Sequence, residues 1–256
     1  MVEKKIKEYE LKIDKSRERE KRSEDQSTAE SVFDLNVRKI IFKLMQKGII
    51  DQIYGAISTG KEANVYRATD SDGNDLAIKI YRITNAETKF MWKYITGDPR
   101  FSDVRKKPRN IVFAWAKKEF KNLNRAKEAN VKVPNPIYQV KNLLVMEFIG
   151  ENTIPAPKLK DVEIQNPNKI FNIIIEYINR LYNEANLVHG DLSEFNILMD
   201  NDEPVIIDIS QAITLEHPNS LRYLLRDIKN ICWYFSKLNL ELPAPVEIYE
   251  YITKGE

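Results

Sequence analysis

The stretch Leu187–Leu198 constrains this chain more than any other part of the sequence. It places His189, Asp191 and Asn196 in the spacing H-x-D-x-x-x-x-N. A carboxylate and a carboxamide on one loop can serve two ends of one reaction, since the aspartate can meet an incoming hydroxyl while the asparagine holds a metal on a phosphate. We expect His189 to brace the loop by hydrogen bonding. Because a short motif also arises by chance, its meaning depends on its surroundings.

Composition indicates a globular protein of one domain or two modest ones. The chain has 256 residues, and 43% of them are apolar, which is enough for a sizeable core. The net charge is only +2, so any surface that binds nucleic acid must be local. A single cysteine, Cys232, excludes a disulfide framework, and with two histidines it leaves little for a zinc site. Without a signal peptide or a long apolar run, we expect a cytoplasmic protein that does not span a membrane.

Residues 1–48 are expected to form a helical N-terminal extension. Residues 1–28 are rich in basic and acidic side chains and poor in apolar ones, which is typical of a solvated helix or a frayed tail. From Ser31 onward apolar residues recur with helical spacing, and Gly48 is a suitable C-cap. We expect this helix to pack on the lobe that follows.

Residues 49–150 have the pattern of a β-rich lobe that ends in a hinge near 147–150. The strand-like stretches are Ile53–Ile57, Asn64–Thr69, Leu76–Tyr81, Ile137–Gln139 and Leu143–Ile149. A helix is expected over residues 111–130. Residues 84–110 hold many basic side chains together with glycine and proline breakers, which predicts a basic, flexible loop.

Residues 151–256 predict a second, mainly helical lobe. Residues 151–157 contain two prolines and are expected to be an irregular linker. The regular elements expected after it are helices at 170–185 and 220–235 and short strands at 197–199 and 205–209.

A candidate phosphate cradle lies at residues 55–61, which nearly spell the Walker A pattern Gly-x-x-x-x-Gly-Lys. Glu62 stands where a serine or threonine would hold magnesium, and Asn64–Arg67 resembles a strand where a helix would be needed. A P-loop ATPase is therefore the less favoured alternative. We expect a β-hairpin loop that covers the phosphates with donors from Ser58 and Gly60, although an ordinary hairpin turn shows the same pattern.

Lys79 is a candidate for the cation that contacts the phosphates. Strand alternation puts Leu76, Ile78 and Ile80 on one face and Ala77 and Lys79 on the other. A lysine that faces inward from a central strand needs an anion, whereas a lysine on a strand is more often solvated. The order of cradle, hairpin turn and Ala-x-Lys favours the inward position.

Glu119 is the expected ion-pair partner of Lys79. It falls on a helical stripe with the apolar residues Val112, Ala116 and Leu123. The lysines that fall off this stripe are Lys117, Lys118 and Lys121. The alternative is that Glu119 is an ordinary exposed glutamate of the helix.

Asp208 ends an apolar strand and is a candidate metal ligand. Magnesium prefers oxygen ligands and keeps several waters, so Asn196 and Asp208 together could hold it against the phosphates. Further along, Asp227 could cap the backbone amides of the loop around Asp191, or it could pair with Arg226 or Lys229 at the surface.

These motifs together resemble the Rio family of atypical serine/threonine protein kinases, and most of all its first subfamily in a compact archaeal-type form. The resemblance covers about residues 30–240, and its motifs are Ser58–Tyr66, Lys79, His189–Asn196 and Ile207–Gln211. Gly190, in place of the arginine of ordinary kinases, also occurs in aminoglycoside and choline kinases. The resemblance implies an α+β, bilobal, protein-kinase-like fold with a β-rich N-lobe and a truncated, mainly helical C-lobe.

The resemblance also implies ATP and magnesium as cofactors, with manganese as an alternative metal. It implies that Lys79 contacts the α- and β-phosphates and is positioned by Glu119, that Asn196 and Asp208 bind magnesium, and that Asp191 is the catalytic aspartate. The adenine would bind the backbone of Glu147 and Ile149, between apolar residues such as Ile57, Val65, Ala77, Met146 and Ile207. The cradle residues implied to bind the nucleotide are Ser58, Thr59, Gly60, Lys61 and Glu62.

Two main functions remain open from the sequence. The first is an ATP-dependent serine/threonine kinase that phosphorylates itself, with Ser102 as a candidate site, and that has an implied role in maturation of the small ribosomal subunit. The second is a ribosome-assembly factor gated by ATP hydrolysis, because the chain lacks an Ala-Pro-Glu segment and room for peptide-binding helices. Its contacts to ribosomal RNA would come from the basic residues Lys89, Lys93, Arg100, Arg105, Lys106, Lys107 and Arg109.

Two further alternatives concern the chemistry. In the ATPase, Asp208 could itself take the phosphate as an acyl-phosphate before water removes it. The His-Gly-Asp triplet at His189 also leaves open a small-molecule phosphotransferase. The sequence defines neither the protein substrate nor the oligomeric state.

Overall fold

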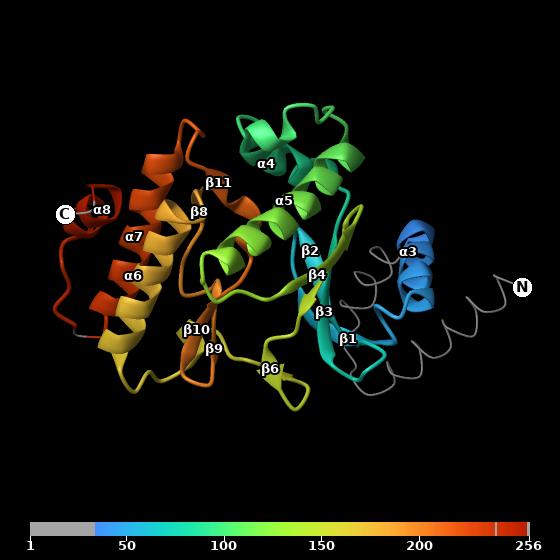
Figure 1. Cartoon of the computed structure of the whole chain (residues 1–256), viewed down its shortest axis with the longest axis horizontal. Coiled ribbons are helices and arrows are strands. Elements are labelled where there is room, and N and C mark those ends of the chain that lie inside the picture. The colour runs from blue at the N-terminus through green and yellow to red at the C-terminus, as the bar shows by residue number, and fades with distance from the viewer. Residues whose placement is uncertain (1–33, 239, 255–256) are drawn as a thin grey trace, which may run out of the picture.

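The computed structural model describes residues 34–238 and 240–254, so the expectation for residues 1–28 lies outside the described part. The chain folds into two lobes (Figure 1). A five-stranded sheet with one helix on its outer face lies at one end, three helices lie at the other, and a long helix crosses between them. This arrangement matches the predicted α+β class.

The sheet of the N-lobe is antiparallel, with the strand order β1-β2-β3-β5-β4. Its strands are β1 (Gln52–Thr59), β2 (Ala63–Thr69), β3 (Asp75–Tyr81), β4 (Pro136–Val140) and β5 (Leu143–Glu147). Alternation along β3 places Leu76, Ile78 and Ile80 in one apolar cluster. Lys79 therefore faces the opposite side of the sheet, as predicted.

Helix α3 (Leu35–Gln46) covers the outer apolar face of this sheet. The side chain of Asp34 caps its N-terminus by accepting a hydrogen bond of 2.8 Å from the amide of Val37. Its buried residues share one side of the helix and join the apolar cluster of the strands: Val37, Ile40, Ile41 and Leu44. Gly48 follows with a φ of 70°, which suits its predicted role at the helix end.

The predicted flexible loop over residues 84–110 is wrong. Residues Asn85–Ile95 form helix α4, and Pro99–Phe101 form a 3-10 turn, η1. The hydroxyl of Thr84 caps α4 by accepting a hydrogen bond from the amide of Glu87. The abundant basic side chains concealed a buried stripe with helical spacing, formed by Thr88, Met91, Tyr94 and Ile95.

Helix α5 (Pro108–Glu128) is buried around much of its circumference, because it packs on β4 and β5 on one side and near the C-lobe turn η3 (Ile209–Gln211) on another. Glu119 points inward, with 1% of its surface exposed. Lys118, which the sequence places off the inward stripe, is fully buried as well. The helix therefore has two buried faces where the periodicity indicated one.

The C-lobe is mainly helical. Its helices are α6 (Pro167–Asn183), α7 (Ser220–Ser236) and α8 (Pro245–Lys254), of which α8 has no counterpart among the predicted elements. Its two-stranded ribbons pair β6 (Gly150–Glu151) with β7 (Ile154–Pro155), β8 (Leu187–Val188) with β11 (Ile213–Thr214), and β9 (Ile197–Asp200) with β10 (Glu203–Ile206). The β6–β7 hairpin occupies much of residues 151–157, where an irregular linker was expected, and the 3-10 turn η2 (Leu159–Asp161) follows.

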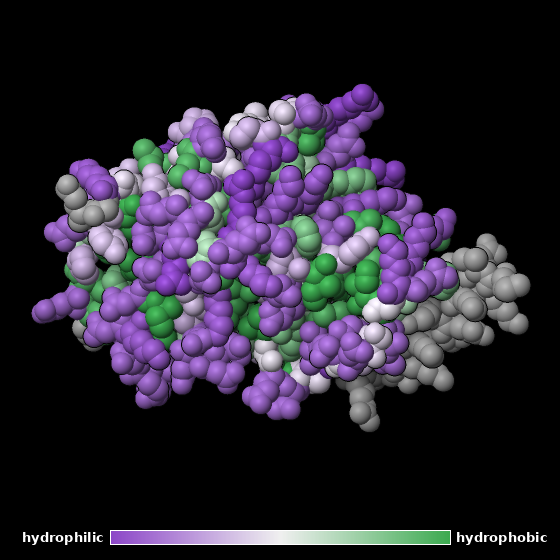
Figure 2. Space-filling view, in the orientation of Figure 1, coloured by the Kyte–Doolittle hydropathy of each residue, from purple (hydrophilic) through white to green (hydrophobic). Residues whose placement is uncertain are grey.

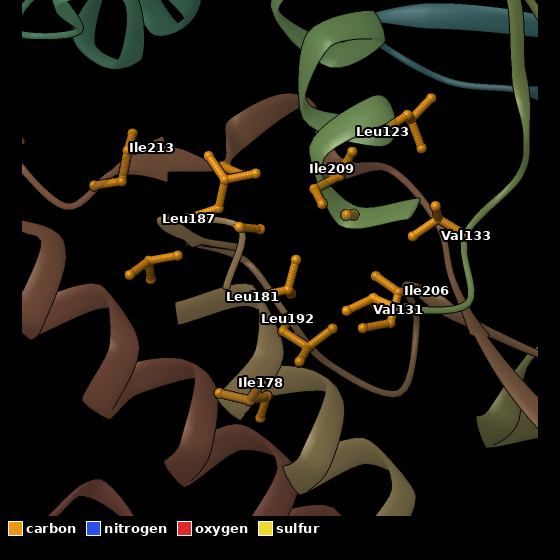
Figure 3. Packing of buried hydrophobic residues seen from close by; sticks show 14 of the residues in the cluster. Leu123, Val131, Val133, Ile178, Leu181, Leu187, Leu192, Ile206, Ile209 and Ile213 are labelled. Atoms are coloured by element: carbon orange, nitrogen blue, oxygen red, sulfur yellow. The ribbon is translucent and has the colours of Figure 1, made fainter. Parts of the chain in front are cut away.

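One apolar core joins the two lobes. Leu123, near the C-terminal end of α5, lies above Ile209, and Val131 and Val133 lie beside Ile206 (Figure 3). The amide of Ile206 also donates a hydrogen bond of 2.9 Å to the carbonyl of Lys132. The base of α5 is therefore fixed to the C-lobe by packing and by the backbone.

The surface is mainly hydrophilic on the face shown in Figure 2, with apolar side chains gathered in smaller patches. Across residues 34–238 and 240–254, the helices are too short or too polar for any of them to cross a membrane.

Candidate functional site

The centre of the candidate site is a set of three charged side chains from three elements. Lys79 Nζ on β3 lies 2.8 Å from Glu119 Oε1 on α5 and 2.7 Å from Asp208 Oδ1, just before η3. The hydroxyl of Tyr81, two residues along β3, donates to the other oxygen of Glu119. The structure therefore brings Lys79 to the partner that the sequence predicted and also to the candidate metal ligand.

The surroundings of Lys79 keep it charged. Burial opposes its charge, but the carboxylates of Asp208 and Glu119 outweigh burial and hold the pKa of Lys79 above its usual range. The side chain of Asp208 is 45% exposed, whereas those of Lys79 and Glu119 are almost fully buried. The positive charge of Lys79 is thus enclosed on the side of buried Glu119 and borders the partly exposed carboxylate of Asp208.

Asp208 adopts the left-handed backbone conformation, with φ 58° and ψ 50°. This conformation is uncommon for residues other than glycine and often marks functional positions. The hydroxyl of Ser210 donates to Asp208 Oδ1 at 2.9 Å. Although burial acts in the opposite direction, Lys79 and Ser210 lower the pKa of Asp208, so it is an anion at neutral pH.

The loop around Asp191 carries the second candidate metal ligand. Asn196 Nδ2 donates to the carbonyl of Asp191 at 2.9 Å, which turns the amide oxygen of Asn196 away from that carbonyl. The amide of Ile207 donates to the carbonyl of Asn196, also at 2.9 Å, so the strand that delivers Asp208 lies directly beside Asn196. The two predicted ligands are thus neighbours.

This donor set fits magnesium. It offers one carboxylate and one carboxamide oxygen, and magnesium is commonly held by one or two protein carboxylates together with waters and substrate phosphates. Among the described residues, no group of three or more His, Cys, Asp or Glu side chains could form a closed metal cage.

The side chain of Asp191 is oriented by Gln211, whose Nε2 donates to Asp191 Oδ2 at 2.9 Å. Burial raises the pKa of Asp191, and Asp208 adds to the effect, while Arg226 and Gln211 oppose it. A carboxylate with a raised pKa accepts a proton more readily, which suits a general base.

Asp227 and His189 support the loop around Asp191 by accepting hydrogen bonds from its backbone amides. Asp227 accepts hydrogen bonds from the amides of Gly190 at 2.7 Å and Leu192 at 3.0 Å, so the two anchored amides lie on either side of Asp191. Asp227 is buried, which rules out the alternative of a surface ion pair. His189 accepts from the amide of Asp191 at 3.3 Å, and burial lowers its pKa to about 4, so it is neutral at neutral pH.

The candidate cradle is a hairpin loop between β1 and β2. The amide of Gly60 donates to the carbonyl of Ala63 at 3.0 Å, and β2 continues directly from Ala63. Because a strand follows the loop where a P-loop would have a helix, the Walker A alternative is wrong. Burial, which has the largest effect, and the charge of Asp208 raise the pKa of Glu62 to about 7. Ser58, Thr59 and Lys61 are exposed on the loop.

The hinge residues continue from β5. Met146 lies opposite Ala77 across the β3–β5 pair, and Val65 lies opposite Lys79 across β2–β3. The amide of Glu147 donates to the carbonyl of Asn135 at 2.9 Å, which ties the hinge to the segment after α5. Val65, Ala77 and Met146, three of the residues predicted to surround the adenine, therefore share a face of the sheet with Lys79. Ile207 follows β10 in the C-lobe.

Sequence reasoning missed several polar residues of the site. The sequence pattern marks Ser210 and Gln211 only as part of the Ile207–Gln211 motif and Tyr81 only as the end of a strand. Their contacts to Asp208, Asp191 and Glu119 link positions far apart in the chain, so no periodicity reveals them. The local pattern Asp-x-Ser-Gln was the only available signal.

Comparison with known families identifies this architecture. The RIO domain family matches residues 64–247. The RIO-type serine/threonine-protein kinase Rio1 of Haloferax volcanii is 42% identical over 244 residues, which cover 95% of this chain and 83% of that protein. The Rio1 protein of the same description from Methanocaldococcus jannaschii is 42% identical over 233 residues, covering 91% and 79%.

The human serine/threonine-protein kinase RIO1 is 39% identical over 250 residues, which cover 94% of this chain but only 44% of the human protein. Among solved structures, the Rio2 kinase of Chaetomium thermophilum in an ADP/Mg²⁺–phosphoaspartate complex superposes with a TM-score of 0.67. It is 23% identical, and the match covers 85% of this chain and 65% of that one. At this identity the likeness shows the fold, and it confirms the kinase-like prediction.

Proposed function

This chain belongs to the RIO domain family, and we propose that it is an atypical serine/threonine protein kinase of the cytoplasm that uses ATP and magnesium, with manganese as an alternative metal. The observation that carries the proposal is the position of Lys79, whose ammonium bridges Glu119 and Asp208 at 2.8 and 2.7 Å. The relatives named as serine/threonine-protein kinases support the same activity.

Each residue of the site would have a separate role in phosphoryl transfer. Lys79, fixed by Glu119, would bind the α- and β-phosphates, and the β1–β2 loop would cover them with its backbone amides. Asn196 and Asp208 would hold magnesium, which supplies charge neutralisation on the phosphates. Asp191 would accept the proton of the incoming hydroxyl, and Gln211 holds its carboxylate in place for that role.

Label transfer from γ-phosphate-labelled ATP tests the proposal. The protein should incorporate label into itself or into an added acceptor with magnesium or manganese, and chelation with EDTA should abolish transfer. Absence of transfer by a folded protein with either metal would contradict it. Transfer to an aminoglycoside or a sugar well above background would instead support the small-molecule phosphotransferase.

We further propose Ser102 as a site of self-phosphorylation. Ser102 is exposed at the end of η1, between α4 and α5. Phosphopeptide mapping of self-labelled protein should find the label on this serine, and Ser102→Ala should remove it. Label on other residues only would contradict the assignment.

A second candidate function is that of an assembly factor for the small ribosomal subunit that uses ATP hydrolysis to set its conformation. It is supported by exposed basic residues on α4, in the segment between η1 and α5, and at the start of α5: Lys89, Lys93, Arg105, Lys106, Lys107 and Arg109. Arg100 does not belong to this surface, because it pairs with Asp98 at 2.7 Å. Association with pre-ribosomal subunits should depend on nucleotide and fall steeply with salt, and binding without either dependence would contradict it.

A variant of the second function has Asp208 as the nucleophile. Its carboxylate would form a bond to the γ-phosphorus while the bond to the bridging oxygen breaks and ADP leaves, and water would then hydrolyse the acyl-phosphate. The exposed half of the Asp208 side chain and the phosphoaspartate in the Rio2 complex support this variant. It predicts a label on Asp208 that hydroxylamine removes, and a label resistant to hydroxylamine would count against it.

A further inference from the structure

Lys118 is a buried lysine that the proposed reaction does not use. It lies on α5 directly before Glu119, and its side chain is fully buried. Its ammonium donates to the carbonyl of Ser210 at 2.9 Å and to the carbonyl of Ala212, and it lies 5.3 Å from the ring centre of Trp115. The ammonium of Lys118 therefore binds backbone carbonyl oxygens of η3 and of the residue after it.

Asn122, one helical turn further along α5, makes the same kind of contact. Its Nδ2 donates to the carbonyls of Ile209 at 3.0 Å and Ala212 at 3.1 Å. Its Oδ1 accepts from Arg100, whose guanidinium also holds Asp98 at 2.7 Å. Two polar side chains of one helix thus bind three carbonyls, those of Ile209 and Ser210 in η3 and that of Ala212 directly after it.

The turn η3 in turn holds both candidate carboxylates. The hydroxyl of Ser210 donates to Asp208, and the side-chain Nε2 of Gln211 donates to Asp191, each at 2.9 Å. A shift of η3 would therefore move Asp208 and Asp191 together.

Stability alone is a weak reason for this arrangement. Burying an ammonium without a carboxylate partner is costly, and burial lowers the pKa of Lys118 to about 7. An apolar side chain of similar length would fill the same space at lower cost. The contacts do, however, fix the orientation of a turn whose side chains must be placed accurately.

We propose that Lys118 and Asn122 are positioning residues, which fix η3 to α5 and thereby set the positions of Asp208 and Asp191 relative to Lys79 and Glu119. The proposal rests on the proposed function only where it concerns the reaction. The contact between α5 and η3 can be tested without any activity.

The test uses Lys118→Met and Asn122→Leu, which keep side-chain volume and remove the donors. Lys117→Met is the matched control, because Lys117 is the exposed neighbour on the same helix. Hydrogen–deuterium exchange of the peptide covering residues 208–214 is compared with that of peptides from α6. Label transfer is then titrated with magnesium at saturating ATP.

In both test variants, amide hydrogen exchange should be faster than in the wild type over residues 208–214 and unchanged over α6. They should need on the order of 10-fold more magnesium for half-maximal transfer, because supporting contacts of metal ligands have effects of that size. The maximal rate should fall roughly 10- to 100-fold, as expected for misplaced reacting groups. Lys117→Met should match the wild type in all three.

Wild-type exchange over residues 208–214 together with a wild-type magnesium requirement would overturn the proposal. So would faster exchange throughout the protein with an unchanged magnesium requirement, since this pattern indicates a purely structural role. If either variant fails to fold, Lys118→Gln and Asn122→Ser, which keep a donor, give the same comparison with smaller effects. A wild type without transfer activity would contradict the proposed function, and the exchange data would still decide on the contact between α5 and η3.

Discussion

Lys79 Nζ lies 2.7 Å from Asp208 Oδ1, although the two residues are 129 positions apart in the chain. Lys79 belongs to the sheet of the N-lobe, and Asp208 belongs to the C-lobe. Glu119, on the helix between the lobes, holds the same ammonium at 2.8 Å. The Lys79–Asp208 contact therefore connects the two lobes at the site, and Glu119 connects the same lysine to α5.

Removal of Lys79 should destabilise the protein, because Glu119 would remain buried without its cation. We expect Lys79→Met to lower the free energy of unfolding by roughly 3 kcal/mol. Adding Glu119→Gln should recover part of this loss, since a neutral amide no longer needs a cation. Urea unfolding of the two single variants and the double variant measures the effect. A double variant no more stable than Lys79→Met would show that Glu119 is not left unpaired.

Asp227 should matter for both stability and rate. In Asp227→Asn one acceptor oxygen becomes a donor group, so one of the amides of Gly190 and Leu192 loses its partner. The expected cost is about 1–3 kcal/mol of unfolding free energy. Label transfer should fall roughly 10- to 100-fold, because Asp191 lies between the two amides.

The matched control for this prediction is Lys229→Ala, since Lys229 is exposed on the same helix. It should leave stability and rate unchanged. Equal stability of Asp227→Asn and the wild type would contradict the role of Asp227 as an anchor of the loop.

The sequence predicted the parts of the site that local pattern controls. Alternation placed Lys79 opposite the apolar face of β3, and helical spacing placed Glu119 on an inward stripe of α5. The motif spacing identified Asp191 and Asn196, and the end of an apolar strand identified Asp208. Each inference needs only the period of an element or the letters of one loop. The structure brings these five residues together around the space between the lobes.

The remaining features could not be predicted, because they depend on contacts between distant elements. Lys118 resembled the exposed lysines beside it, and only the close approach of η3 makes it a buried donor. Helix α4 was concealed because it lies within residues 84–110, a stretch rich in basic side chains and breakers. Its buried stripe is meaningful only once α5 offers Trp115 to pack on. The sequence places Arg100 among the basic residues expected to contact RNA, whereas in the structure its guanidinium binds Asp98 and Asn122.

His189 should make stability depend on pH. Burial lowers its pKa to about 4 in the folded protein, while an unfolded histidine titrates near 6.5. Between these values the unfolded state binds more protons, so the stability that His189 contributes is complete above about pH 6.5 and is lost as pH falls towards 4. The slope should reach about 1.4 kcal/mol per pH unit at most.

Unfolding free energies of the wild type and His189→Asn, measured from pH 8 to pH 4, isolate this contribution, because the other titrating groups cancel in the difference. The curve of the variant should be flatter over the acidic range. Parallel curves would show that His189 does not titrate with a lowered pKa.

The basic surface of α4 and the start of α5 should carry any binding to RNA. Charge reversal in Lys106→Glu and Lys107→Glu should weaken binding to a ribosomal RNA fragment and reduce the slope of log affinity against log salt by roughly 1 for each phosphate contact that is lost. Lys254→Glu is the control, because Lys254 is exposed on α8, which lies at the end of the C-lobe, away from α4 (Figure 1). Equal losses for the control and the test variants would show that the binding has no defined surface.

Single-turnover label transfer by the wild type and Asp191→Ala tests the central claim most directly. Asp191 is held by Gln211 and lies beside the candidate metal ligand Asn196, and its raised pKa suits a base. The rate should fall about 10²- to 10⁴-fold in the variant, with the affinity for nucleotide little changed. Transfer at the wild-type rate by Asp191→Ala would contradict the account of this site as a kinase centre.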